Sequence, residues 1–270
     1  MKKVVLITGA SAGIGKETAK QLLQQEMYTV YGAARRVENM QDIASIGAHI
    51  ISLDITNDSS IRNCIDTIIA KEGRIDILIN NAGYGSYGAI EDVSIDEAKR
   101  QFEVNLFGLA RITQLVLPHM RNNSYGYIIN ISSVAGKTYS PLGGWYHASK
   151  HALEGFSDCL RFEVAPFGIR VIIVEPGLIE TEWGGIALDS AIATSKKTVY
   201  APYVTGLQSI FNTMKNPSPP STIAHVIVRA LTSKHPKTRY VAGKGAKPLL
   251  LLKHLISDKI YDAIMRKLIK

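Results

Sequence analysis

The sequence predicts an α/β protein built as one Rossmann-like, doubly wound domain, with a parallel sheet of about seven strands and helices on both faces. Short β-branched apolar runs alternate with stretches of helical period along the 270 residues, which is the pattern of repeated strand-helix units. Several of these runs are apolar almost throughout, as in strands that are buried on both faces. Since no long Pro, Gly or Ser linker divides the chain, we expect a single domain over residues 1–270 with right-handed crossovers.

The elements follow one another in a regular order. The expected strands cover residues 3–8, 28–33, 48–53, 76–80, 125–132, 169–175 and 238–243. The expected helices cover residues 14–26, 58–71, 95–121, 147–165 and 220–233. Residues 181–216 form an insertion after the sixth strand, and a loop of that length is typical of a lid or a binding loop. In the tail, residues 244–270, apolar positions 252, 255, 256, 260, 263, 264 and 268 fit one helical face.

The amino-acid composition predicts a folded protein that resides in a reducing compartment. Apolar residues make up 46% of the chain and there are only two cysteines, Cys64 and Cys159, which are too few for a disulfide framework. The apolar run Val4–Ile7 is too short for a signal peptide, and no stretch reaches the length of a membrane span. We therefore expect a cytoplasmic protein.

The charge is concentrated in the tail. The net charge is +8, and residues 244–270 contain seven Lys or Arg and two Asp. No nucleic-acid-reading motif accompanies this charge, so nucleic acid is not an expected partner. The apolar face and basic flanks of the tail allow peripheral contact with an anionic membrane. The alternative, which we favour, is a helix that covers the substrate pocket or a neighbouring subunit.

A glycine-rich turn, ITGASAGIG, follows the first strand at residues 7–15. In an open parallel sheet this turn is the phosphate site. Gly9 allows a tight exit from the strand, Gly13 lets the backbone meet a pyrophosphate, and Gly15 lets the helix pack closely. The turn predicts dinucleotide binding, and the alternative is an ordinary strand-to-helix connection.

Five further motifs follow this turn in order. They are NNAG at 80–83, VNLFG with Asn105, INISS ending at Ser133, YHASK with Tyr146 and Lys150, and EPGLIET at 175–181. Together with the spacing TGxxxGxG, they resemble the short-chain dehydrogenase/reductase family in its small soluble form. The resemblance covers residues 1 to about 182, with a weaker match through the seventh strand.

Tyr146 and Lys150 are four residues apart, so on a helix they share a face. A free tyrosine has a pKa of about 10, and a nearby ammonium favours the phenolate. The pair can therefore transfer a proton, although such pairs usually mark a half-exposed helix face. The resemblance implies that Tyr146 exchanges the proton with Lys150 assisting, that Ser133 binds the substrate oxygen, and that Asn105 holds a water relay. His147 is expected to be a packing or surface residue, and no metal site is expected because the other histidines show no ligand pattern.

The residues at the end of the second expected strand predict that the cofactor is NADP rather than NAD. NAD enzymes of this fold carry an acid there, whereas here residues 27–37 contain none and Arg35 and Arg36 follow Ala34. Guanidinium groups suit a 2′-phosphate, with a solvated basic loop as the alternative. Ala12 stands where some NADP enzymes of the family have a basic residue, so the preference is not expected to be complete. By resemblance, the remaining cofactor contacts come from the following residues, together with Tyr146 and Lys150: Ser11, Ile14, Asp54, Ile55, Asn81, Ala82, Gly83, Pro176, Gly177, Ile179 and Thr181.

Aromatic and apolar residues gather in the loops after the fourth, fifth and sixth strands. Tyr84, Tyr139, Leu142 and Trp183 are the candidate substrate contacts, and local packing is the alternative reading. Such a lining suits a small apolar carbonyl or alcohol, and the resemblance extends to members that act on lipid-, steroid- or retinoid-like compounds.

The predicted function is an NADP-dependent carbonyl reductase or alcohol dehydrogenase that acts on a CH–OH group. One alternative is a non-catalytic NADP-binding sensor or scaffold on the same fold, and an epimerase or dehydratase is a third possibility. The family resemblance implies a homodimer or homotetramer formed through residues 95–121 and 147–165.

Overall fold

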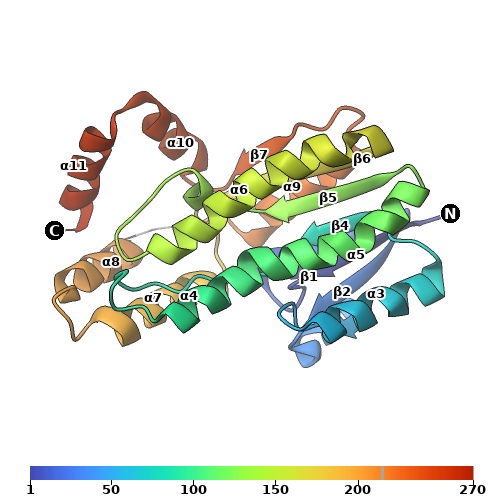
Figure 1. Cartoon of the computed structure of the whole chain (residues 1–270), viewed down its shortest axis with the longest axis horizontal. Coiled ribbons are helices and arrows are strands. Elements are labelled where there is room, and N and C mark those ends of the chain that lie inside the picture. The colour runs from blue at the N-terminus through green and yellow to red at the C-terminus, as the bar shows by residue number, and fades with distance from the viewer. Residues whose placement is uncertain (214–215, 270) are drawn as a thin grey trace.

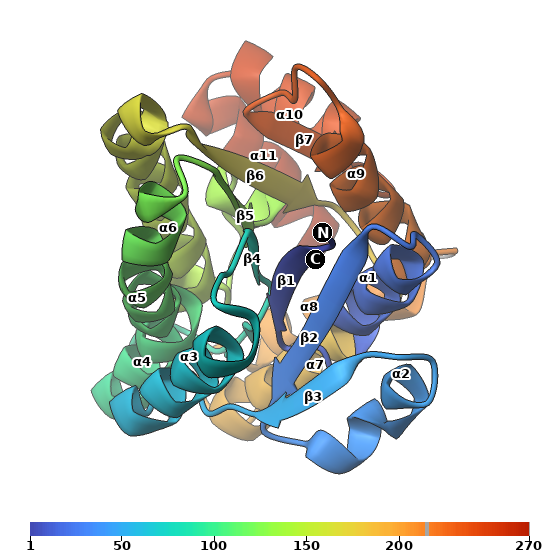
Figure 2. The same cartoon turned by 90° about the vertical axis from the view of Figure 1, so that its right-hand side faces the viewer.

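The computed structural model describes residues 1–213 and 216–269. Within these residues, seven parallel strands form one sheet in the order β3-β2-β1-β4-β5-β6-β7, with helices on both faces (Figures 1 and 2). The strands are β1 Lys3–Thr8, β2 Tyr28–Ala34, β3 His49–Ser52, β4 Ile77–Asn80, β5 Gly126–Ile131, β6 Ile169–Pro176 and β7 Arg239–Ala242. This is the predicted Rossmann-like architecture, and every predicted strand is present to within one or two residues.

Helices connect the strands and extend beyond them. They are α1 Gly13–Leu23, α2 Gln41–Ala44, α3 Asp58–Glu72, α4 Ile95–Phe102, α5 Gly108–Asn122, α6 Gly144–Val164, α7 Glu182–Ser195, α8 Ala201–Thr213, α9 Pro220–Thr232, α10 Ala246–Leu255 and α11 Asp258–Ile269. Short 3₁₀ turns occupy Val37–Met40, Val134–Gly136 and Ala165–Phe167, and a π-helical turn, Glu103–Phe107, joins α4 to α5.

The core has one layer on each face of the sheet. On one face, α1 and α2 pack beside β1 and β2 through Leu22 and Ile43, and α9 packs against α1, β6 and β7 through Ile227. On the other face, α3, α5 and α6 pack onto β1, β4 and β5, with Ile61 and Val116 among the fully buried side chains. The strands read as continuous apolar runs because both of their faces are covered.

The strand order reverses beside β1, and this reversal positions the site. The chain adds β2 and β3 on one side of β1 and then places β4 on the other, where Ile7 pairs with Ile79. In open α/β sheets a ligand binds outside the carboxyl ends of the strands at such a point. The turns after Thr8 and Asn80 therefore face each other across the predicted cofactor crevice.

The insertion after β6 is helical where the sequence predicted a loop. Residues 181–216 contain α7 and α8, which lie at the carboxyl end of the sheet (Figure 1). The adjacent glycines Gly184 and Gly185 lie at the start of this segment. Both are accommodated in the first turn of α7, whose later residues Ala187 and Ala191 are fully buried.

The tail forms two helices rather than one. Ile256 is extended (φ −110°, ψ 151°) between α10 and α11, and Ser257 accepts the first backbone hydrogen bonds of α11 from Ile260 and Tyr261. The single apolar face predicted for this segment is therefore wrong. Tyr261 and Ile269 are buried instead, whereas four of the predicted positions are exposed, namely Leu252, Leu255, Ile260 and Leu268.

Candidate active site

The glycine turn is held in place by backbone and amide hydrogen bonds. Gly9 has φ +69°, a left-handed conformation that costs a glycine little. Asn81 Nδ2 donates to the carbonyl oxygens of Thr8 (3.0 Å) and Gly9 (3.1 Å). A Cβ on Gly15 would meet that amide and would lie 2.6 Å from the Gly9 oxygen. The turn therefore requires glycine at both ends, which agrees with the sequence prediction.

Thr8 links this turn to the segment after β4, a role that the sequence analysis missed. Its hydroxyl oxygen accepts from the backbone N–H groups of Asn81 (3.1 Å) and Ala82 (3.0 Å). The two segments approach closely here, since a Cβ on Gly9 would lie 2.9 Å from Ala82 Cα. Asn81 is thus occupied with shaping the crevice as well as lining it.

The N-terminus of α1 has free backbone donors. Ala12 precedes the helix and provides no side-chain cap, so the first N–H groups of α1 lack a capping oxygen. Across the crevice, Thr181 Cγ2 is the nearest atom to the Cβ that Gly13 lacks, at 3.0 Å. A helix N-terminus with uncapped donors is suited to a phosphate, and Ser11 and Ile14 flank the same turn.

The adenosine end of the predicted crevice carries one acid and two arginines. Asp54 Oδ1 accepts from the Thr56 backbone N–H (3.0 Å) and hydroxyl (2.8 Å). These bonds, with help from the Arg35 charge, lower the pKa of Asp54, so this carboxylate is ionised near neutral pH. Ile55 is buried beside it.

Arg36 makes an ion pair that the sequence did not predict. Its Nη2 lies 2.9 Å from Glu182 Oε2, at the start of α7, and both side chains are about half exposed (50% and 56%). The electrostatic effect of Arg35 reaches both Asp54 and Tyr84. Arg35 therefore lies close enough to influence both groups, and Glu182 already pairs with Arg36.

The segment after β6 borders the crevice on the other side. Gly177 donates its backbone N–H to Ala242 (2.8 Å), and Leu178 donates to Lys244 (3.0 Å). Ile179 forms a bridge to Ser218. These contacts tie Pro176–Thr181 to β7 and place Thr181 opposite Gly13.

The predicted reaction residues lie together at the carboxyl end of β5. Tyr146 and Lys150 belong to the first turns of α6, which begins at Gly144, three residues earlier than predicted, and Ser133 is the N-cap of the 3₁₀ turn Val134–Gly136 after β5. Burial raises the pKa of the Tyr146 phenol to about 12, and a hydrogen bond with Ser133 opposes this shift. Lys150 Nζ lies 6.0 Å from the centre of the Tyr146 ring.

The side chain of Lys150 is held by a hydrogen bond to the main chain of β5. Its Nζ donates to the Ile131 carbonyl oxygen at 2.8 Å, and the residue is 6% exposed. Burial lowers the pKa of Lys150 to about 8, although the Glu154 carboxylate favours the charged form. Burial thus brings the neutral amine of Lys150 closer in free energy to the ammonium than in a free lysine.

Asn105 fixes the loop after β4 to the α6 helix. Its Oδ1 accepts from the Tyr84 backbone N–H (3.0 Å), and its Nδ2 donates to the Tyr84 carbonyl (2.9 Å) and the Ser149 hydroxyl (3.1 Å). A Cβ on Gly83 would lie 3.2 Å from Asn105 Oδ1 and 3.7 Å from Lys150 Nζ. Asn105 sits in the π-helical turn, a feature that is frequent at functional sites.

Two of the four candidate substrate residues pack around the tyrosine. The Trp183 ring centre lies 4.9 Å from that of Tyr146 and 5.8 Å from that of Tyr87. Leu142 is buried in the same cluster, with φ +64°, a strained conformation for a bulky residue and one that is common at functional sites. Val204 of α8 also joins this cluster, a contact that an insertion expected to be a loop could not reveal.

The other two candidates, Tyr84 and Tyr139, lie outside that cluster. The Tyr84 hydroxyl donates to Glu97 (2.9 Å) on the Asn105 side. The Tyr139 hydroxyl donates to Asp262 of α11 (2.9 Å). Each phenol bonds a carboxylate rather than Tyr146, so the structure does not bring these two candidates into the cluster around the tyrosine.

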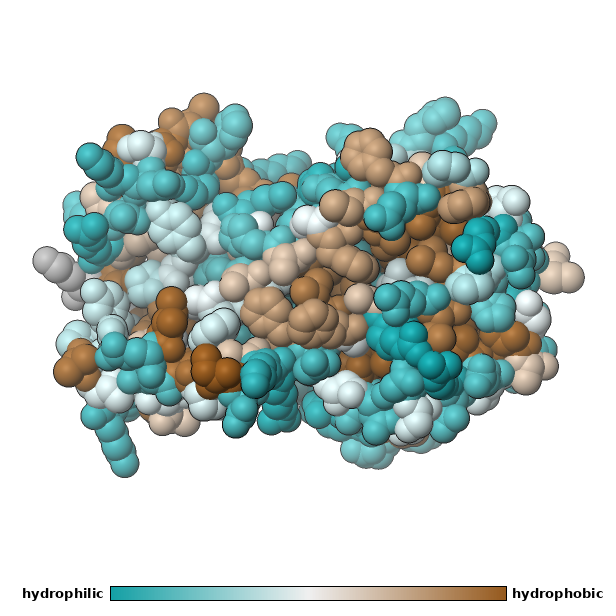
Figure 3. Space-filling view, in the orientation of Figure 1, coloured by the Kyte–Doolittle hydropathy of each residue, from teal (hydrophilic) through white to brown (hydrophobic). Residues whose placement is uncertain are grey.

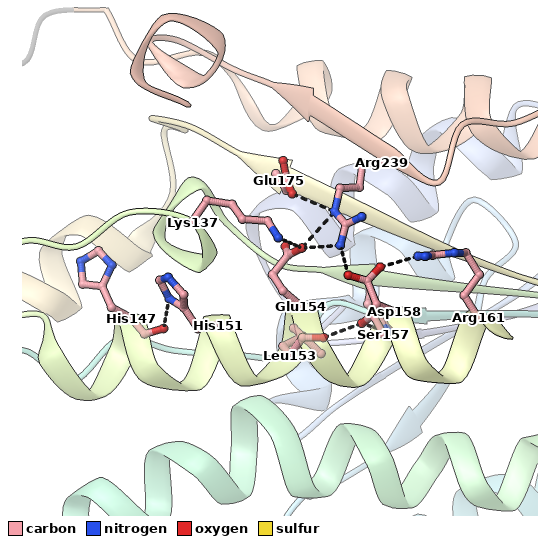
Figure 4. A network of polar contacts seen from close by, with 11 residues as sticks. Lys137, His147, His151, Leu153, Glu154, Ser157, Asp158, Arg161, Glu175 and Arg239 are labelled. Atoms are coloured by element: carbon pink, nitrogen blue, oxygen red, sulfur yellow. Dashed lines mark hydrogen bonds and ion pairs between the residues drawn. The ribbon is translucent and has the colours of Figure 1, made fainter. Parts of the chain in front are cut away.

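A charged network lies behind Lys150, one turn further along α6 (Figure 4). Glu154 Oε2 is 3.1 Å from Arg239 Nη2 and 3.2 Å from Lys137 Nζ. Glu175, at the end of β6, is 3.3 Å from Arg239 Nε. Burial and the neighbouring Glu154 charge raise the pKa of Glu175 to about 7. The network joins α6 to β6 and β7.

His147 has a packing role, as the sequence analysis expected. Its Nδ1 lies 3.0 Å from the Ala135 carbonyl oxygen, and its Nε2 lies 2.9 Å from the Ser140 hydroxyl. Burial lowers the pKa of this imidazole. Both ring nitrogens are therefore engaged in fixing the loop before α6.

Comparison with known proteins places this geometry in a family. The family model for short chain dehydrogenases matches residues 3–188, and the chain belongs to that family of oxidoreductases. It is 36% identical over 264 residues to a probable short-chain type dehydrogenase/reductase, VdlC, of Helicobacter pylori, covering 97% of this chain and 96% of that protein. It is also 36% identical over 241 residues to the 3-ketodihydrosphingosine reductase of Bacteroides thetaiotaomicron, covering 89% and 88%.

Solved structures agree in fold and differ in cofactor. A short-chain dehydrogenase from Streptomyces avermitilis superposes with a TM-score of 0.83 at 34% identity, covering 98% of this chain and 96% of that one. A serine dehydrogenase complexed with NADP+ gives 0.77 at 28% identity, covering 89% and 94%. A 3-ketoacyl-(acyl-carrier-protein) reductase from Brucella melitensis, complexed with NADH, gives 0.74 at 26% identity, covering 90% and 97%. The family thus binds nicotinamide dinucleotides of both kinds.

Proposed function

We propose that this protein transfers a hydride between NADP(H) and a carbonyl or secondary alcohol of an apolar molecule. The observation that carries the proposal is that Ser133, Tyr146 and Lys150 lie together at the carboxyl end of β5. The Tyr146 phenol forms a hydrogen bond with Ser133, and Lys150 Nζ lies 6.0 Å from the centre of the Tyr146 ring. A bound nicotinamide would supply or accept the hydride.

The residues of the crevice fit a dinucleotide. The uncapped N-terminus of α1 and the turn from Gly9 to Gly15 would hold the pyrophosphate. Asp54 and Ile55 would contact the adenine, Asn81–Gly83 the adenosine ribose, and Pro176–Thr181 the nicotinamide. Arg35 and, second, Arg36 would bind a 2′-phosphate, since no acid stands at the end of β2.

Tyr146 would transfer the proton. In the reductive direction its hydroxyl donates a proton to the carbonyl oxygen, while the Ser133 hydroxyl donates a hydrogen bond to the same oxygen. Burial makes the resulting phenolate unfavourable, because it raises the pKa of Tyr146 to about 12. The Lys150 ammonium offsets that cost and would also bind the nicotinamide ribose. Asn105 would position the water through which the proton is replaced.

The surroundings of Tyr146 support an apolar substrate. Trp183, Tyr87 and Leu142 present hydrophobic surface beside the phenol, and Tyr84 and Tyr139 would frame the opening. The similarity to a 3-ketodihydrosphingosine reductase supports a ketone on a lipid-like chain. This arrangement suits a ligand with one polar handle.

Replacing Tyr146 by Phe tests the proposal. Because the phenol alone supplies the proton, we expect kcat for NADPH-dependent reduction of a panel of ketones to fall by about a hundred- to ten-thousandfold. NADPH binding, measured by nucleotide fluorescence, should persist. If the wild-type protein binds NADPH but reduces none of these ketones, the non-catalytic sensor or scaffold becomes the better interpretation.

Two further proposals concern assembly and location. Phe107 and Phe162 are exposed (53% and 76%) on the segments expected to join subunits, which supports a homodimer or homotetramer. Light scattering of the wild-type protein and a Phe162→Glu variant tests this assembly. The cytoplasmic location stays a prediction from cysteine content; among the described residues, no helix is long and apolar enough to cross a bilayer.

A further inference from the structure

Large apolar side chains project into solvent from the two tail helices. Leu251, Leu252 and Leu255 are 60%, 40% and 70% exposed on α10, and Ile260 and Leu268 are 53% and 57% exposed on α11. On α10, Leu255 is four residues after Leu251 and three after Leu252, so it lies next to both of them on one side of the helix. Apolar atoms accordingly stand out among polar ones at the upper left of the molecule, over α10 and α11 (Figure 3).

The opposite side of the tail already anchors it to the body. The Tyr261 hydroxyl donates to the Tyr139 carbonyl oxygen (3.2 Å), and the two rings stack edge to face at 4.8 Å. Asp262 accepts from the Tyr139 hydroxyl, and Ile269 is buried against Gly206 of α8. The exposed leucines therefore contribute little to holding the tail in place, so burial within this chain does not explain them.

The two aspartates of the tail have ionic or hydrogen-bond partners, whereas three of its lysines have none among the described residues. Asp258 and Asp262 are both paired, the first with Lys253 Nζ at 2.5 Å and the second with Tyr139 and Arg266. Lys247, Lys259 and Lys267 are exposed and have no hydrogen bond or ion pair within residues 1–213 and 216–269. The outer face of the tail thus combines apolar side chains with uncompensated positive charge.

We propose that the outer face of α10 and α11 docks on an anionic lipid bilayer. Exposed leucines can insert at the boundary between headgroups and acyl chains, while flanking lysines bind acidic headgroups. A surface that met a second protein would need a defined partner shape, whereas a fluid bilayer accepts leucines that splay from two helices. The inner side of the tail contacts Tyr139 and α8, so docking through the outer face holds this end of the molecule next to the lipid.

Vesicle co-sedimentation of the full chain tests this interface without cofactor or substrate, so the result does not depend on the proposed reaction. Vesicles of phosphatidylcholine mixed with phosphatidylglycerol should bind the wild-type protein, and vesicles of phosphatidylcholine alone should bind it at least about tenfold more weakly. High salt should weaken the binding. The Leu251→Glu/Leu255→Glu variant and the Lys259→Glu/Lys267→Glu variant should each lose about tenfold or more in partitioning.

Ile46→Glu is the matched control, because Ile46 is also exposed (53%) but precedes β3, away from the tail. Its vesicle binding should equal that of the wild type. Circular dichroism melting of all variants shows whether they are folded. The proposal is wrong if the wild type ignores anionic vesicles or if the leucine variant binds as well as Ile46→Glu. It is equally wrong if the leucine substitutions only dissociate an oligomer, since the face would then cover a second copy.

Discussion

The two sides of the crevice are built in different ways. On the cofactor side, glycines and small polar groups are fixed by main-chain hydrogen bonds, as where Asn81 bonds both Thr8 and Gly9. On the substrate side, rings and alkyl chains such as Trp183 and Leu142 pack together in a hydrophobic cluster. A site made from backbone tolerates no added atom, whereas a site made from packed side chains can be rebuilt by substitution. The cofactor side should therefore be rigid and the substrate side adaptable.

Gly15→Ala and Gly185→Ala compare the two sides most directly and should show the largest difference. A Cβ at Gly15 meets Asn81 and the Gly9 oxygen, while at Gly185 of α7 nothing lies within 4 Å. We expect Gly15→Ala to lower the free energy of unfolding by about 1–3 kcal/mol and to abolish measurable NADPH binding. Gly185→Ala should raise stability by about 0.5–1 kcal/mol. Urea titration and nucleotide fluorescence measure both, and equal tolerance would remove the distinction.

The arginines at the cofactor end should determine the choice of nucleotide. If Arg35 and Arg36 bind the 2′-phosphate, Arg35→Leu/Arg36→Leu should raise KM for NADPH by about ten- to hundredfold, as expected for lost charge-assisted bonds. KM for NADH should stay within about twofold, because NADH has no phosphate there. A wild-type preference for NADH, or equal losses with both nucleotides, would show that these arginines belong to a solvated loop.

The pH dependence of kcat/KM should report the protonation of Lys150, which lies between the two sides of the crevice. Burial lowers its pKa to about 8, so the ammonium is present below that pH and is lost above it. Because the ammonium stabilises the Tyr146 phenolate, kcat/KM for reduction should fall by about tenfold per pH unit above about 8. A profile that stays flat to strongly alkaline pH would mean that Lys150 remains charged in the working enzyme.

Glu182→Gln should give the smallest effect. Glu182 pairs with Arg36 at 2.9 Å and is half exposed, so it competes weakly with a phosphate for that guanidinium. Removing its charge should lower KM for NADPH by roughly two- to fivefold and leave KM for NADH unchanged. Asp189→Asn is the control, because Asp189 lies on the same helix but has no hydrogen-bond or ion-pair partner among the described residues. A rise in KM would indicate that Glu182 supports the nucleotide site.

The sequence predicted the elements whose pattern is local. All seven strands and the glycine turn were found, because buried parallel strands are continuous apolar runs and the turn needs glycine at fixed positions. The reaction residues were likewise predicted together, and the structure brings Ser133, Tyr146 and Lys150 to one place. Their roles came from the family resemblance rather than from the residues alone.

Contacts between distant segments could not be predicted in this way. Glu182 meets Arg36 across 146 residues, and Glu154 meets Arg239 across 85, without any periodicity to mark them. The helices α7 and α8 were predicted as a loop because residues 181–216 interrupt the regular alternation of strands and helices. The tail was read as one helix because sequence period carries no sign of the break at Ile256.

Glu182 and Trp183 are neighbours in the chain, yet they touch opposite sides of the crevice: one holds Arg36 and the other covers the Tyr146 ring. Any shift of the first turn of α7 must change both contacts at once. For the proposed pair of ligands, NADP(H) and a ketone, thermodynamic linkage requires reciprocity: whatever factor the 2′-phosphate contributes to ketone affinity, the ketone returns to nucleotide affinity. Cooperativity between the two proposed ligands would then depend on the first turn of α7.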